Sequence, residues 1–128
     1  MSDKQMMVLS MLEDIQFSIE LILKRFAKIE TSDDFLSDEE GLEKLDSISM
    51  RLVAIGEGFK SIDKLTQKKL LAQYDTIDWK GVKGIRDILS HHYFDLDAEI
   101  IFNICDRYLN ELLNVTQQIR NDVAKHTR

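Results

Sequence analysis

The first part of the chain carries apolar residues at alternating steps of three and four. They stand at Val8, Leu12, Ile15, Ile19, Ile22, Phe26 and Ile29. This period predicts an amphipathic helix of about seven turns at 3.6 residues per turn. Ser2 and Gln5 stand just before it with the spacing of a capping box, in which each side chain bonds the backbone N–H of the other residue.

A second stretch of the same period follows a short polar break at residues 31–34. Ser37 and Glu40 have the spacing of a second capping box. The apolar positions after it are Leu45, Ile48, Leu52, Ile55, Phe59 and Ile62. Gly56 and Gly58 lie inside this predicted helix, where each costs roughly 1 kcal/mol relative to alanine. We therefore expect another helix or a ligand to approach closely there.

The next part of the chain predicts shorter elements. Residues 66–74 are long enough for a short helix, and residues 75–78 form a loop in which Thr76 or Asp78 caps the next helix. That helix runs from Trp79 to about Ser90, and residues 94–97 turn the chain.

The last predicted helix runs from about Asp97 to Val123 and has an unusually broad apolar face. One stripe holds Ile101, Ile104, Tyr108, Leu112, Val115 and Ile119, and a second holds Phe102, Cys105, Leu109 and Leu113. A face this broad indicates burial on two sides, against the rest of the protein and against a second subunit. No useful strand-like alternation occurs. We predict an all-α fold, an antiparallel up-down bundle of four to five helices forming a single domain over residues 1–128.

Composition narrows the class of protein. The 128 residues, 44% hydrophobic and 31% charged, suffice for one soluble domain. No apolar run approaches the roughly 20 residues of a membrane span, and the polar N-terminus does not resemble a signal peptide. The single cysteine, Cys105, excludes an internal disulfide and a cysteine-based zinc site, which fits a reducing cytoplasm. The net charge of −6 disfavours non-specific binding along nucleic acid, so any nucleic-acid site must be focal, or assisted by dimerisation or a partner.

Candidate chemistry is concentrated in one stretch, which reads Arg86-Asp87-Ile88-Leu89-Ser90-His91-His92-Tyr93-Phe94. Arginine binds phosphate as a two-pronged donor, and histidine exchanges protons near neutral pH. On a regular helix Arg86 and Tyr93 share a face, but Arg86 and His91 lie about 140° apart. Either the helix ends near Ser90 and His91 swings round, or two protomers share the site. Taken alone, the spacing favours an ordinary ion pair for Arg86 and histidines at a helix end.

Three blocks together resemble the HepT-like family of the HEPN superfamily. They are residues 46–57, with Ile-Gly-Glu at its end, residues 77–85, with Trp79, and residues 86–97, with arginine, four residues, histidine, one residue and Tyr-Phe. The similarity covers nearly the whole chain. Gly58 replaces the usual alanine, Asp78 the proline before Trp79, and Asp95 a common glycine.

The resemblance implies a HEPN-like helical bundle that forms a two-fold homodimer. It also implies a ribonuclease toxin encoded beside a minimal nucleotidyltransferase antitoxin, with Arg86 and His91 as catalytic residues and Tyr93 as the AMP acceptor. Glu57 is a candidate to orient Arg86 or His91, and His92 and Asp87 are further supporting candidates. We expect no metal, cofactor or DNA substrate.

A mechanism follows from these residue types. RNA carries an internal nucleophile, the 2′-OH, which DNA lacks. His91 takes its proton or protonates the leaving oxygen, while Arg86 holds the phosphate. AMP on Tyr93 blocks the site by bulk and charge. Two alternatives remain: a non-catalytic HEPN subunit that presents substrate to a nucleotidyltransferase, which the acidic charge favours, and a purely structural helical dimer.

Overall fold

The computed structural model describes residues 2–90 and 97–125, and these residues form helices without any strand. In chain order the elements are α1 (Asp3–Phe26), the 3-10 turn η1 (Ser32–Phe35), α2 (Glu39–Leu65), the 3-10 turn η2 (Leu71–Gln73), α3 (Trp79–Lys83), α4 (Ile85–Ser90), α5 (Ala98–Asn103), the π-helical turn η3 (Ile104–Tyr108) and α6 (Leu109–Lys125).

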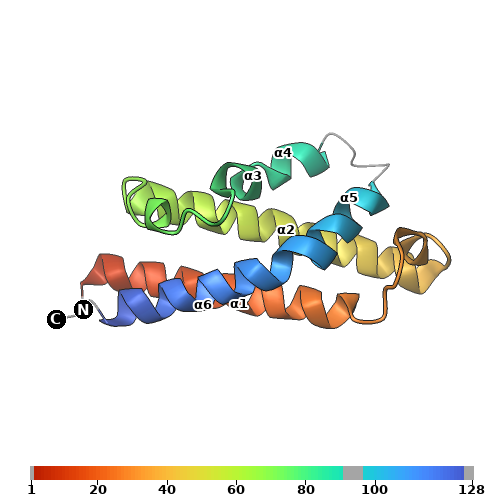
Figure 1. The fold of residues 1–128 in the computed structure, drawn as a ribbon, viewed down its shortest axis with the longest axis horizontal. Coiled ribbons are helices and arrows are strands. Elements are labelled where there is room, and N and C mark those ends of the chain that lie inside the picture. The colour runs from red at the N-terminus through yellow and green to blue at the C-terminus, as the bar shows by residue number, and fades with distance from the viewer. Residues whose placement is uncertain (1, 91–96, 126–128) are drawn as a thin grey trace.

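These helices form the predicted up-down bundle. α1 and α2 run antiparallel, α3 and α4 return along α2, and α5 to α6 run back beside α1 (Figure 1). The buried side chains at the predicted stripes form one core, including Leu12, Ile19, Ile22, Ile48, Leu52, Phe59, Ile101 and Ile119. Among the described helices, none combines the length and the apolar character that crossing a membrane requires.

The caps explain where the long helices begin. Ser2 Oγ accepts from the Gln5 N–H at 3.1 Å and Gln5 Oε1 accepts from the Ser2 N–H at 3.0 Å, which confirms the first capping box. The second cap is Asp38 and not Ser37, because the Asp38 carboxylate accepts from the Gly41 N–H at 2.7 Å. The sequence prediction placed this cap one residue too early.

Three other predictions need correction. α1 ends at Phe26, and Ile29 is buried in the chain that follows it. Residues 66–74 contain only the single turn η2. The helix predicted from Trp79 to Ser90 is two helices that meet at Gly84, whose N–H bonds the carbonyls of Lys80 and Gly81 and ends α3.

A π-helical turn divides the last predicted helix. The wider turn at η3 keeps both Cys105 and Leu109 in the core and leaves Tyr108 61% exposed. Within one chain Tyr108 therefore lies outside the core, and its burial against a second subunit stays a prediction. The helix starts at the expected place, since the Asp97 carboxylate accepts from the N–H groups of Glu99 and Ile100.

Candidate active site

Arg86 lies in the first turn of α4 and faces outward. Ile85 and Leu89 of the same helix are buried, whereas the residues between them, including Arg86 and Asp87, are exposed. The α3–α4 segment approaches α2 closely at Gly56, where an added Cβ would lie 2.7 Å from the Val82 carbonyl oxygen. The close approach expected from this glycine is therefore made by another helix.

The Glu57 carboxylate connects Arg86 to α2. Arg86 Nη1 lies 3.5 Å from Glu57 Oε1, and Lys60 Nζ lies 3.8 Å from the same oxygen. The Arg86 side chain is 61% exposed and that of Glu57 39%. One carboxylate thus holds two outward-facing cations at the surface. The contact fits the orienting role considered for Glu57, and it equally fits an ordinary ion pair of Arg86.

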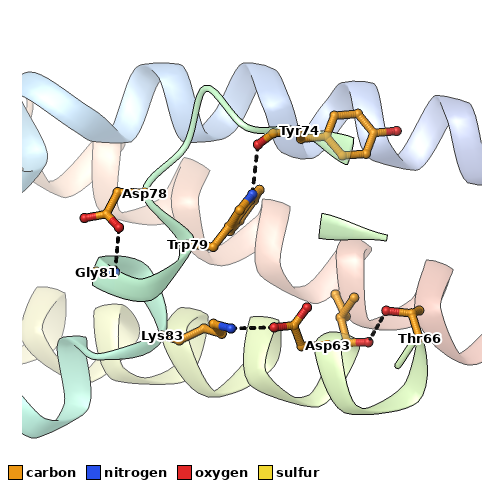
Figure 2. A network of polar contacts seen from close by, with 8 residues as sticks. Asp63, Thr66, Tyr74, Asp78, Trp79, Gly81 and Lys83 are labelled. Carbon is orange, nitrogen blue, oxygen red and sulfur yellow. Dashed lines mark hydrogen bonds and ion pairs between the residues drawn. The ribbon is translucent and has the colours of Figure 1, made fainter. Parts of the chain in front are cut away.

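A polar network fixes α3 on α2 and so determines where α4 begins (Figure 2). Lys83 at the end of α3 pairs with Asp63, a carboxylate that is otherwise buried in the face of α2. The indole N–H of Trp79 donates to the Tyr74 carbonyl oxygen at 2.9 Å, and its ring packs 4.8 Å from that of Phe59. Of the two predicted caps, Thr76 and Asp78, it is Asp78 that caps the helix, by accepting from the Gly81 N–H.

Asp63 and Lys83 belong to no motif of the sequence and were not among the predicted site residues. One signal in the sequence could have indicated this pair: Asp63 lies on the same face of the predicted helix as Gly56 and Phe59. An unpaired carboxylate on that face would be costly to bury. A lysine had to reach it from another element, and Lys83 does so. The pair is a positioning contact for the α3–α4 segment.

The preceding loop is tied to α6. The Tyr74 hydroxyl donates to Asp122 Oδ2 at 2.6 Å. Burial, together with this bond to a carboxylate, raises the pKa of Tyr74 to about 12. Burial and the neighbouring Asp106 likewise raise the pKa of the Cys105 thiol to about 12, so this cysteine is a poor nucleophile.

Several predicted site residues lie outside the described part of the chain. These are His91, His92 and Tyr93, together with Asp95. Whether Arg86 and His91 converge therefore stays a prediction. Within residues 2–90 and 97–125, no group of three or more His, Cys, Asp or Glu side chains is arranged to hold a metal ion.

The chain is similar in sequence to three proteins whose names include a ribonuclease activity. A "Putative RNase" of Methanocaldococcus jannaschii is 29% identical over 92 residues, which is 71% of this chain and 70% of that protein. A Caldanaerobacter subterraneus protein, also named "Putative RNase", is 27% identical over 114 residues, which cover 89% of this chain and 92% of that protein. A longer M. jannaschii protein bears the name "Gamma-glutamylcyclotransferase and putative RNase". It is 29% identical over 115 residues, which cover 90% of this chain and 48% of that protein.

No solved structure is significantly similar to the chain. The model of the family described as "Ribonuclease HepT-like" matches residues 15–119, a span that runs from α1 through α6 and includes Glu57, Arg86 and the described part of the site. The chain therefore belongs to the HepT-like ribonuclease family.

Proposed function

We propose that this protein is a metal-independent endoribonuclease in which Arg86 binds the scissile phosphate and His91 moves protons. The observation that carries the proposal is the placement of Arg86, exposed on α4 and held at one nitrogen by Glu57. A guanidinium has five N–H donors. A single contact to Glu57 leaves others for a phosphate, in the bidentate geometry that arginine favours.

The reaction is an internal transfer at phosphorus. The 2′-oxygen bonds to the adjacent phosphorus and the bond from phosphorus to the 5′-oxygen breaks, which yields a 2′,3′-cyclic phosphate and a 5′-hydroxyl. Neutral His91 accepts the proton of the 2′-OH, and a second His91, as imidazolium, protonates the departing 5′-oxygen. Arg86 stabilises the charge that develops on the non-bridging oxygens. DNA is not a substrate because it lacks the 2′-OH.

A homodimer supplies the acid and the base from two chains. Near the end of α4, Ile88 is 47% exposed, and Tyr108 stands exposed on η3. Ile88, two residues after Arg86, suits a two-fold interface beside the Arg86 segment, and Tyr108 offers a second exposed side chain on η3. Sedimentation at micromolar concentration is expected to give about twice 14.9 kDa. A monomer at that concentration contradicts the shared site.

Control of the enzyme resides in Tyr93. A minimal nucleotidyltransferase antitoxin transfers AMP from ATP to the Tyr93 hydroxyl and releases pyrophosphate. Tyr93 is seven residues from Arg86 in the sequence, and the AMP that it carries blocks the site by its bulk and repels RNA by its charge. The protein is then a cytoplasmic ribonuclease toxin held inactive by its antitoxin.

Expression in bacterial cells tests this function. The wild-type chain is expected to arrest growth, and His91→Ala to relieve the arrest at equal protein levels. With the cognate nucleotidyltransferase and ATP, mass spectrometry is expected to find AMP on the peptide containing Tyr93. Tyr93→Phe is expected to stay toxic when the antitoxin is present. AMP on another residue, or neutralisation of Tyr93→Phe by AMP transfer, contradicts the assignment.

A further inference from the structure

The charge of this protein is strongly segregated along the chain. Seven of its 17 basic residues but only three of its 23 acidic residues fall within residues 60–86. That segment carries a net charge of +4, so the rest of the chain carries −10. At the other end of the bundle, residues 30–46 hold eight acids and one lysine. An acidic protein thus has one basic segment, which runs from the last part of α2 through η2 and α3 to the start of α4 (Figure 1).

The basic residues of α2 extend outward from the candidate site. Glu57, Lys60 and Lys64 are spaced at i, i+3 and i+7, which places them on one face of the helix. Lys60 and Lys64 are both exposed, and Lys60 shares the Glu57 carboxylate with Arg86. From Glu57 to Lys64 the helix rises about 10 Å at 1.5 Å per residue.

A tight hook at the end of α2 continues the basic surface. Gln67 and Lys68 both have left-handed backbone conformations, with φ of 54° and 62°. The Lys68 N–H donates to the Asp63 carbonyl at 2.8 Å, and the Lys69 N–H to the Thr66 carbonyl at 3.0 Å. These bonds turn the chain back on the helix, where Lys68 and Lys69 are exposed. The left-handed conformation is costly for residues other than glycine, and these two backbone bonds offset that cost.

A groove of about 600 Å³ lies beside Lys64, between the beginning of α1 and the end of α2. Lys4 and Lys64 provide its cationic groups, and Met7, Met11 and Leu65 its apolar lining. Thioether side chains contact aromatic rings favourably and adapt to their shape. The combination suits a strand with phosphates on the outside and unstacked bases that can enter the groove.

We propose that single-stranded RNA leaves the Arg86 site along α2, with phosphates at Lys60 and Lys64 and then at the Lys68–Lys69 hook. The substrate class rests on the proposed function, whereas the track rests on the placement of these lysines. The acidic end repels the strand, so the RNA lies on one side of Arg86. This focal track explains how a protein of net charge −6 holds a polyanion.

The test compares two variants of equal net charge. Lys64→Gln/Lys69→Gln removes two charges from the track, and the control Lys24→Gln/Lys28→Gln removes two exposed charges near the acidic end. The probe is a fluorescent ten-nucleotide 2′-O-methyl RNA, which cannot be cleaved. Binding is measured by anisotropy between 50 and 300 mM salt. Each lost phosphate contact is expected to lower the slope of log affinity against log salt by about 0.7, or about 1.4 for the pair.

The same contacts predict about 25-fold weaker binding of the track variant at 0.1 M salt. The control is expected to keep the wild-type slope and affinity. If both variants show the same slope of log affinity against log salt, the proposed track is wrong, even where the wild-type protein cleaves RNA. Unchanged RNA binding with lost association to the nucleotidyltransferase also overturns it and assigns the surface to a protein partner. If the wild-type protein binds RNA but cleaves none, the proposed function is contradicted. The comparison of the two salt slopes still tests whether RNA follows the track.

Discussion

Arg86 and Glu57, 29 positions apart in the sequence, meet at 3.5 Å across the junction of α4 and α2. Both side chains are more than one-third exposed, and an ion pair of this kind contributes little to stability. Its consequence is positional, since the contact restrains a guanidinium in the first turn of α4. Lys60, 3.8 Å from the same carboxylate, competes for it.

Glu57→Ala is expected to lower cleavage while leaving folding intact. An unrestrained Arg86 misplaces the phosphate, and misplacement near 1 Å costs up to about 10²-fold in rate. Because the pair is exposed, the free energy of unfolding is expected to change by no more than about 0.5 kcal/mol. Glu57→Gln keeps an acceptor and is expected to recover part of kcat. Full activity of Glu57→Ala would show that Glu57 does not position Arg86.

Gly56→Ala is expected to destabilise the protein, because its Cβ would lie 2.7 Å from the Val82 backbone oxygen. Forcing α3 away from α2 costs about 1–3 kcal/mol. Gly58→Ala is the matched control. Its Cβ meets only side-chain atoms of Ile15, at 2.9 Å, and a gain in helix propensity of about 1 kcal/mol offsets the adjustment. Urea unfolding of the two variants measures the difference, and an equal loss in both contradicts this account.

The Tyr74–Asp122 bond gives stability a defined dependence on alkaline pH. The folded state raises the pKa of Tyr74 to about 12, above its unfolded value of about 10, so folding favours the protonated phenol. This contribution is complete below pH 10 and is lost as the pH rises from about 10 to 12. Tyr74→Phe is expected to cost about 1 kcal/mol at pH 8.

The difference between wild type and Tyr74→Phe is expected to shrink by pH 11, as measured by urea unfolding at both pH values. Asp75→Asn, at the exposed neighbour of Tyr74, serves as the control and is expected to match the wild type at both pH values. A difference for Tyr74→Phe that stays constant from pH 8 to pH 11 contradicts the role of the partly buried phenol.

Features that depend on near neighbours in the chain were predictable. The Ser2–Gln5 capping box, a cap at Thr76 or Asp78, the start of the last helix near Asp97 and the close packing at Gly56 were all expected, and the structure shows each of them. The atoms that form each helix cap belong to residues only a few positions apart in the sequence. The contact at Gly56 is a tertiary one, but the glycine within a predicted helix indicates it.

Features that depend on tertiary packing were not predictable. Trp79, Val82, Ile85 and Leu89 keep a helical period across the break at Gly84, so the pattern hides it. The π-helical turn likewise preserves an apolar face while turning Tyr108 outward. The burial of Asp63 depends on Lys83, which arrives from another helix.

Cleavage of RNA by the purified protein tests the central assignment of Arg86 and His91 most directly. We predict products with 2′,3′-cyclic phosphate ends, formed equally well in excess EDTA. Arg86→Ala and His91→Ala are each expected to abolish them without lowering the melting temperature. Arg25→Ala, in the last turn of α1, is expected to cleave as the wild type does. Normal cleavage by either Arg86→Ala or His91→Ala, or loss of wild-type cleavage on chelation, would contradict the account.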